Sequence, residues 1–171
     1  SLRRGALGDD FQQLFVDIVL RHATTLLDAL GTVPLSALQA RAASALAQRV
    51  KPLRLLLLGT AGTGKMHTVQ TTLQELLRLL AARGIDASFV KVAAPTGPAA
   101  FNLRFNATTI HRLIHHRNLR RPFGELRDTA LAALQKAFEK TFLLVLDEVS
   151  MIGRQFMGRI DSRLCQAKAA W

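Results

Sequence analysis

The chain has 171 residues, of which 49% are hydrophobic and 20% are charged. A chain of this length and composition buries a core without disulfides or metal, which excludes wholesale disorder. Its single cysteine excludes an internal disulfide framework, and its purely apolar runs, such as Leu55–Leu58 and Phe142–Leu146, are too short to span a bilayer. We therefore expect no membrane partner and an intracellular location, in the nucleus if the host is eukaryotic.

The charge is strongly positive and unevenly distributed. Lys and Arg number 23 against 12 Asp and Glu, which gives a formal net charge of +11. No acidic residue occurs between Ala87 and Gly124, and this stretch carries several arginines and three histidines. Such a basic block suits a nucleic-acid backbone, although a solvated surface explains it equally well.

Apolar residues recur at helical spacing over much of the chain, and short apolar runs lie between these stretches. The predicted helices span residues 10–30, 36–49, 65–82, 99–103, 108–116, 125–139 and 153–165. The predicted strands span residues 53–58, 88–93 and 142–146. Short apolar strands that alternate with helices imply an α/β fold with a parallel sheet covered on both faces. Ligands of such sheets bind at loops that leave the carboxyl ends of the strands, here 59–66, 94–98 and 147–152.

The first of these loops, Gly59–Met66, matches the phosphate-loop pattern Gly-x-x-x-x-Gly-Lys. Its glycines let backbone N–H groups turn toward phosphate oxygens, and the helix that follows directs its positive end at the same phosphates. Lys65 adds a positive charge at the β and γ phosphates and is one of two predicted catalytic residues. The predicted nucleotide-binding residues are Gly59, Thr60, Ala61, Gly62, Thr63, Gly64, Lys65 and Met66.

Met66 occupies the position at which the pattern has Ser or Thr, whose hydroxyl ligates Mg²⁺. A thioether is a poor ligand for this hard cation. His67 and Thr68 do not replace the hydroxyl, because successive helix residues point in different directions. We predict that nucleotide binding is kept while Mg²⁺-dependent turnover is impaired.

The predicted strand 142–146 runs directly into two carboxylates, Asp147 and Glu148. In a phosphate-loop ATPase these residues have separate tasks: Asp147 would hold Mg²⁺, and Glu148 would orient and deprotonate the attacking water. An apolar run followed by Asp-Glu is a weak signal alone, but here it accompanies the phosphate loop. We expect Lys65 and the acidic pair to act on one triphosphate.

Four strings, taken in order, resemble the PIF-type (petite integration frequency) DNA helicases, which are RecD-like members of helicase superfamily one. They are the phosphate loop, Ala-Pro-Thr-Gly-Pro-Ala-Ala at 94–100, Thr-Ile-His at 109–111 and Asp-Glu-Val-Ser-Met-Ile at 147–152. The resemblance covers about 35–167. It implies that 35–171 is a first RecA-like ATP-binding domain, a P-loop NTPase fold with a parallel sheet flanked by helices. Residues 1–34 are left as an N-terminal helical segment.

This resemblance implies 5′→3′ unwinding of DNA coupled to ATP hydrolysis, with ATP and Mg²⁺ as cofactors and roles in DNA repair, recombination and telomere maintenance. The implied partner is single-stranded DNA or a forked duplex. Gln39 corresponds to a glutamine that reads adenine, with an exposed helix glutamine as the alternative. Phe101 and Phe105 either stack on a base or belong to the core. The residues implied to line the path of the strand are Pro95, Thr96, Gly97, Asn102, Thr109 and His111.

The sequence also departs from this family. Besides the substitution at Met66, the later motifs of the family, its second RecA-like domain and its arginine finger are missing from this chain. Since unwinding needs two such domains to close on ATP, we expect the chain by itself to be inactive as a motor. The alternatives are an ATP- or single-strand-DNA-binding module without helicase activity, and a P-loop nucleotide binder unrelated to helicases.

Overall fold

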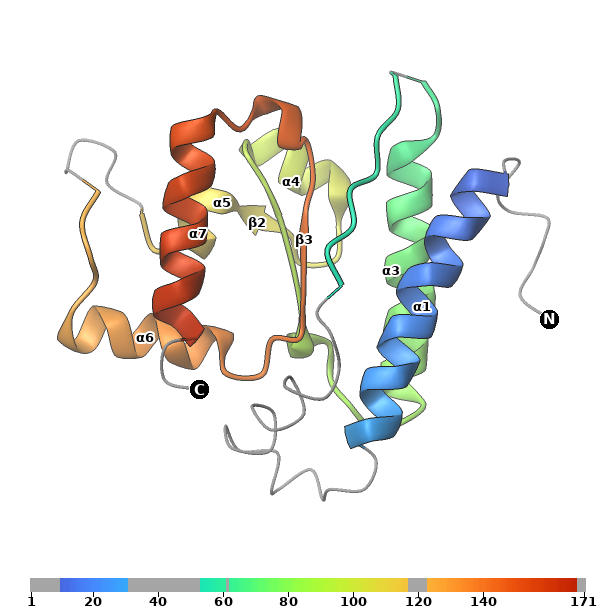
Figure 1. The fold of residues 1–171 in the computed structure, drawn as a ribbon, viewed down its shortest axis with the longest axis horizontal. Coiled ribbons are helices and arrows are strands. Elements are labelled where there is room, and N and C mark those ends of the chain that lie inside the picture. Colours follow the sequence, from blue (N-terminus) through green and yellow to red (C-terminus); the bar gives the residue numbers. More distant parts are fainter. Residues whose placement is uncertain (1–9, 31–52, 61, 117–122, 169–171) are drawn as a thin grey trace. The chain divides into compact units, whose positions relative to one another are not determined.

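The structure is a computed structural model that describes residues 10–30, 53–60, 62–116 and 123–168 (Figure 1). The chain divides into two compact units, Ser1–Ala87 and Ser88–Trp171, and each is described by itself. The predicted helix 36–49, with Gln39, lies outside the described residues, as does Ala61. The domain boundary predicted between residues 34 and 35 stays a prediction.

The first unit contains two long helices, α1 (Asp10–Leu30) and α3 (Lys65–Ala81), which pack against each other. Both helices agree with their predicted ranges to within one residue. Helix α1 buries one face, because its buried residues recur every three or four positions. These residues are Val16, Val19, Ala23 and Leu27 on α1, and α3 contributes Leu73, Leu76 and Leu80 to the core.

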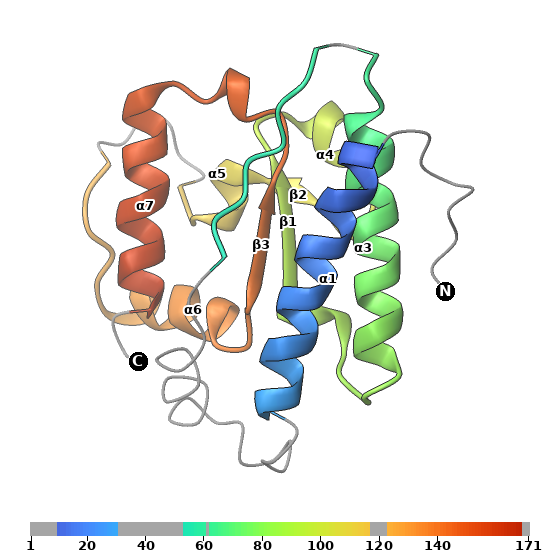
Figure 2. The ribbon, with the colours of Figure 1, turned by 45° about the vertical axis from the view of Figure 1, so that its right-hand side comes forward.

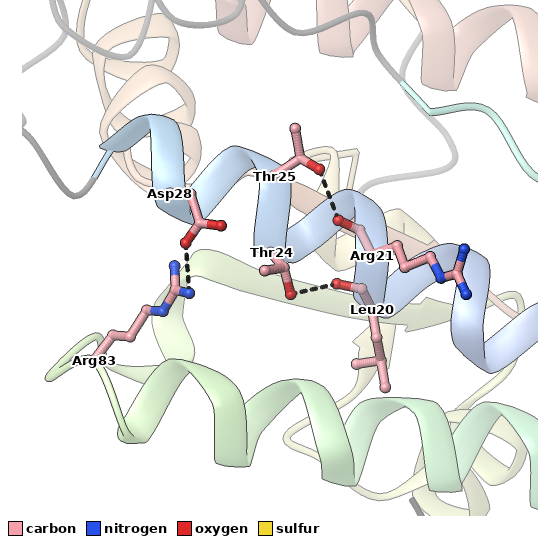
Figure 3. Close-up of polar contacts among 6 residues, drawn as sticks. All are labelled: Leu20, Arg21, Thr24, Thr25, Asp28 and Arg83. Carbon is pink, nitrogen blue, oxygen red and sulfur yellow. Dashed lines mark hydrogen bonds and ion pairs between the residues drawn. The ribbon is translucent and has the colours of Figure 1, made fainter. Parts of the chain in front are cut away.

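Helices α1 and α3 run in the same direction, as the contacts at their ends show. At the start of α1, the Gln12 side chain donates a hydrogen bond to the Thr63 carbonyl, just before α3. At its other end, Asp28 forms an ion pair of 2.6 Å with Arg83, just after α3 (Figure 3). The hydroxyls of Thr24 and Thr25 donate to carbonyls four residues back, within α1.

The strand predicted over 53–58 is wrong. This segment has no regular secondary structure, and Leu55, Leu56 and Leu58 are 42%, 62% and 78% exposed. A strand forms only where a neighbouring strand pairs its N–H and C=O groups. No described strand pairs with this segment, because the sheet consists of three strands from the second unit. The prediction failed because it rested on the apolar composition of the segment and not on a pairing partner.

The second unit contains a parallel sheet of three strands, β1 (Val90–Ala94), β2 (Thr108–Thr109) and β3 (Leu143–Leu146). Their order is β2-β1-β3, so β1 lies in the middle (Figure 2). This confirms the predicted α/β fold with a parallel sheet. Strand β1 starts two residues later than predicted because a 3₁₀ turn, η2 (Ala87–Phe89), precedes it. Strand β2 was predicted as part of a helix, since two residues are too short to show a strand period.

The helices of the second unit flank this sheet. They are α4 (Gly97–Leu103), α5 (Ile110–Leu113), α6 (Asp128–Phe138) and α7 (Arg154–Lys168), with a 3₁₀ turn η3 (Val149–Met151) after β3. The core joins β1 to α5, α6 and α7 through Ala93, Ile110, Leu113, Ile114, Leu134, Phe138, Ile160 and Ala167. None of the helices in the described ranges is long and apolar enough to cross a membrane.

Candidate functional site

The phosphate loop of the first unit opens directly into α3, as predicted. Gly62 and Gly64 have φ of 80° and 76°, a left-handed conformation that glycine adopts without a steric penalty. A Cβ atom on Gly59 would lie 2.7 Å from the Thr63 hydroxyl oxygen, so any other residue there would force the Thr63 side chain to shift. The Thr63 hydroxyl donates to the Thr60 carbonyl at 2.9 Å, which closes the loop on itself.

Lys65 is the first residue of α3, and its ammonium is held by the loop that precedes it. Its Nζ donates to the carbonyls of Gly59 at 2.5 Å and of Thr60 at 2.6 Å. The positive charge is therefore fixed beside the loop, at the helix end whose free N–H groups already favour an anion. This arrangement suits phosphate groups.

The helix does not offer a hydroxyl in place of Met66. The Thr68 side chain is fully buried, and its hydroxyl donates to the Gly64 carbonyl at 3.1 Å. Thr72, one turn further, donates in the same way to the Thr68 carbonyl at 2.8 Å. Both hydroxyls are thus engaged with the backbone of α3, and the ligand that Met66 lacks is not supplied by its neighbours.

In the second unit, the three motifs that follow the phosphate loop leave the same edge of the sheet. Strand β1 ends at Ala94 and continues into Pro95–Gly97, while β2 ends at Thr109 and continues into His111. The pairing of Ala94 with Thr109 and of Ala93 with Leu146 aligns the three strand ends. The structure therefore brings the candidate DNA-binding loops and the acidic pair to one edge.

Asp147 carries an unsatisfied atom in this edge. Its Oδ2 is buried and has no hydrogen-bond partner among the described residues. A buried carboxylate oxygen needs a donor or a cation, and oxygen is the ligand that Mg²⁺ prefers. No group of three or more His, Cys, Asp and Glu in the described residues is arranged to hold a metal. Asp147 thus fits a cation that takes one protein carboxylate and fills its other positions with water and phosphate oxygens.

Glu148 has an unusual backbone. Its φ of 51° and ψ of 41° are left-handed, a conformation that costs a non-glycine residue about 1–2 kcal/mol. Its carbonyl accepts a hydrogen bond from the Met151 N–H at 2.9 Å, which closes the turn η3. The side chain is exposed. Strain of this kind gathers at functional sites, and the sequence gives no local sign of it.

Thr96 and Thr109 cap helices, a role that the sequence reasoning missed. The Thr96 hydroxyl accepts a hydrogen bond from the Ala99 N–H at 3.3 Å, and the Thr109 hydroxyl accepts from the Arg112 N–H at 3.4 Å. The predicted helices began at residues 99 and 108, whereas α4 and α5 begin at Gly97 and Ile110, so the two threonines did not stand at predicted N-cap positions. A hydroxyl that accepts one bond still has a proton to donate, so capping is compatible with a phosphate contact.

The other candidate DNA contacts lie on the helices that follow these strand ends. Asn102 is exposed on α4, and the neighbouring Phe101 is 84% exposed, which excludes a core role for Phe101. His111 is half-buried on α5, where its ring stacks on Phe156 with centroids 4.4 Å apart.

A basic aromatic cluster, His116, Phe123, Arg159 and Arg163, lies next to His111. The Arg163 and Arg159 guanidinium carbons lie 4.3 Å and 5.5 Å from the centre of the Phe123 ring. His116 meets the same ring edge-on at 5.3 Å. Burial lowers the pKa of His116 below its ordinary value of 6.5, and the charges of Arg159, His111 and Arg163 lower it further. Sequence reasoning missed this cluster because its members are far apart along the chain.

A glycine-rich loop that opens a helix, together with a parallel sheet flanked by helices and a strand that ends in Asp-Glu, defines a P-loop NTPase domain of the RecA-like kind. The family model described as AAA domain (AAA_19) matches residues 39–169, and the chain belongs to this family. Domains of this family occur in UvrD- and PIF-type helicases. The searches of the curated proteins and of the solved structures found no match.

Proposed function

We propose that the chain is the first motor domain of a PIF-type, RecD-like DNA helicase, which couples ATP hydrolysis to 5′→3′ unwinding in DNA repair, recombination and telomere maintenance. The observation that carries this proposal is the shared sheet edge at which Pro95–Gly97, Thr109–His111 and Asp147 meet. The resemblance to PIF-type helicases assigns the first two loops to the DNA strand, and their place beside Asp147 supports coupling of strand binding to ATP hydrolysis.

For ATP, each residue has a defined task. Lys65 binds the β and γ phosphates, and Gln39 reads the adenine. Asp147 holds Mg²⁺, and Glu148 orients the attacking water and accepts its proton. When bound, Mg²⁺ neutralises charge on the phosphate oxygens. Met66 removes one of its usual ligands, so we expect weak hydrolysis. The joint action of Lys65 and the acidic pair stays a prediction, because they belong to different units.

For the strand, the loops at the sheet edge offer complementary contacts. Thr96, Thr109 and Asn102 contribute hydroxyl and amide donors for phosphates. Phe101, exposed on α4, stacks on a base. Base stacking on an aromatic ring is worth about 1–3 kcal/mol, and it does not depend on base identity. The net charge of +11 favours binding to the phosphate backbone.

The decisive experiment measures binding of a labelled single-stranded oligonucleotide to the 171-residue chain, with and without ATP and Mg²⁺. We expect Phe101→Ala to weaken strand binding about tenfold. Phe11→Ala is the matched control, because Phe11 is also highly exposed, at 79%, but lies on α1. Equal strand affinity of the Phe101→Ala variant and the unsubstituted chain would contradict the proposed strand path.

A second candidate function is an ATP- or single-strand-DNA-binding module without helicase activity, and Met66 is the observation that favours it. This module would bind its ligands but show no hydrolysis stimulated by the strand. Measuring ATP hydrolysis with and without the oligonucleotide separates the two functions. A P-loop nucleotide binder unrelated to helicases would bind ATP and ignore the strand.

A further inference from the structure

Helix α1 lies outside the residues that the family model matches, yet its first turn contacts the phosphate loop. The Gln12 side-chain Nε2 donates a hydrogen bond of 2.8 Å to the carbonyl of Thr63. Thr63 lies two residues before Lys65, so the contact is made next to the residues that the phosphate-loop pattern requires.

The approach of Gln12 to the loop is close. A Cβ atom built on Gly64 would lie 2.9 Å from the Gln12 Nε2 and 3.6 Å from its Cδ. Glycine at this position therefore serves two needs, since it allows φ of 76° and makes room for the Gln12 amide. The amide of Gln12 packs directly on the backbone of the loop.

The hydrogen bond fixes the orientation of one peptide group. The Thr63 carbonyl and the Gly64 N–H belong to the same planar trans peptide, in which the two groups point in opposite directions. When the carbonyl is held toward α1, the Gly64 N–H is turned away from α1. Backbone N–H groups of this loop are the donors that bind phosphate oxygens. Gln12 therefore controls the direction of one such donor.

Helix α1 is anchored well enough to act as a support. Its buried face packs on α3, and the ion pair between Asp28 and Arg83 joins the two helices at the end opposite to Gln12 (Figure 3). The position of Gln12 relative to the start of α3 is thus set by the packing of two helices rather than by a loop.

We propose that Gln12 is a positioning residue of the nucleotide site: through the Thr63 carbonyl it holds the phosphate loop in the conformation that binds phosphate groups. This inference rests on the proposed binding of ATP by the loop. Loss of one hydrogen bond to the backbone corresponds to a change in affinity of about two- to tenfold.

The test compares the affinity of the 171-residue chain and three variants for ATP, ADP and AMP, together with their thermal unfolding midpoints. Gln12→Ala removes the donor, and we expect it to weaken ATP binding about two- to tenfold. Gln13→Ala is the matched control, because the Gln13 amide bonds Asp17 within α1 at 3.0 Å and not the loop. We expect it to bind all three nucleotides as the unsubstituted chain does.

Gln12→Glu separates positioning from a structural role. It keeps the size of the side chain, replaces the donor with a carboxylate and places a negative charge beside the loop. We expect affinity to fall most for ATP, less for ADP and least for AMP, following their charge. The unfolding midpoint should change little, because the favourable negative charge in the first turn of the helix offsets the lost hydrogen bond.

Three outcomes would overturn the inference. Unchanged ATP affinity of Gln12→Ala would overturn it, as would equal losses in the Gln12 and Gln13 variants. Equal losses for ATP, ADP and AMP that follow a drop in the unfolding midpoint would assign Gln12 a structural role only. If the unsubstituted chain binds no nucleotide, the proposed function and this inference fail together, whereas each of the three outcomes above leaves the proposed function intact.

Discussion

The backbone N–H of Asp147 donates to the carbonyl of Ala93 at 2.9 Å, one residue beyond the last pair of the β1–β3 ladder. This bond keeps the acidic residue in the sheet edge instead of a free loop. Its Oδ2 is nevertheless buried without a partner in the described ranges. Burying this oxygen without a partner lowers the stability of the fold, which is typical of a residue that is needed for its chemistry.

Lys65→Ala tests whether the phosphate loop of the first unit binds ATP while the loops of the second unit bind the strand. The substitution removes the ammonium that bonds the Gly59 and Thr60 carbonyls. We expect ATP affinity to fall at least tenfold, because charge-assisted bonds to phosphate are lost, while strand affinity stays within about twofold. Parallel titrations with ATP and with a labelled oligonucleotide measure both. Loss of strand binding with retained ATP binding would reverse the assignment of the loops.

Met66→Thr tests whether the missing hydroxyl limits turnover. A threonine at this position restores an oxygen ligand for Mg²⁺, and we expect ATP hydrolysis to rise about tenfold or more. ATP affinity should also become dependent on Mg²⁺, as measured with the ion and with a chelator. The double variant Lys65→Ala/Met66→Thr is the control and should be inactive. Equal rates for the single variant and the unsubstituted chain would refute a limiting role of Met66.

Glu148 links backbone strain to catalysis, and two substitutions separate them. Glycine relieves the left-handed conformation, whereas alanine does not, so Glu148→Gly should be more stable than Glu148→Ala by about 1 kcal/mol. Both should lose hydrolysis by about 10²-fold or more in the Met66→Thr background, because the base is gone. Urea unfolding and a phosphate-release assay provide the two measurements. Equal stability of the two variants would show that η3 relaxes once the carboxylate is removed.

Much of the fold follows from local patterns. The helical spacing of α1 and α3 and the apolar runs of β1 and β3 predicted these elements, and alternation predicted the parallel sheet. Segment 53–58 has the same apolar character as β3, yet it forms no strand, because pairing depends on a partner that composition does not specify. Residue propensities indicate which secondary structures a segment can adopt, and tertiary contacts determine which one it adopts.

The candidate site was predictable where its chemistry lies within one motif, as in the phosphate loop and the acidic pair. Contacts between distant segments were not. The bond from Gln12 to Thr63 spans 51 residues, and the packing of Arg163 on Phe123 joins α7 to a residue before α6. Such contacts depend on how whole helices pack, and no short spacing rule records them. No sequence pattern predicts the left-handed backbone of Glu148 either.

The buried His116 predicts a pH-dependent stability of the second unit. Its pKa is lowered in the folded state by burial and by Arg159, His111 and Arg163. Below pH 6.5, the ordinary value, the unfolded chain gains a proton at this residue before the folded chain does. We therefore expect the stabilisation from neutral His116 to be fully present above about pH 6.5 and to fall as the pH drops toward the lowered pKa.

Urea unfolding between pH 5 and pH 8 measures this pH dependence, with His116→Phe as the variant and His22→Gln as the control. The Phe variant should show a shallower decline than the control, because it removes one titrating group while the aromatic contact with Phe123 can persist. Identical declines in both variants would assign the pH dependence to other groups.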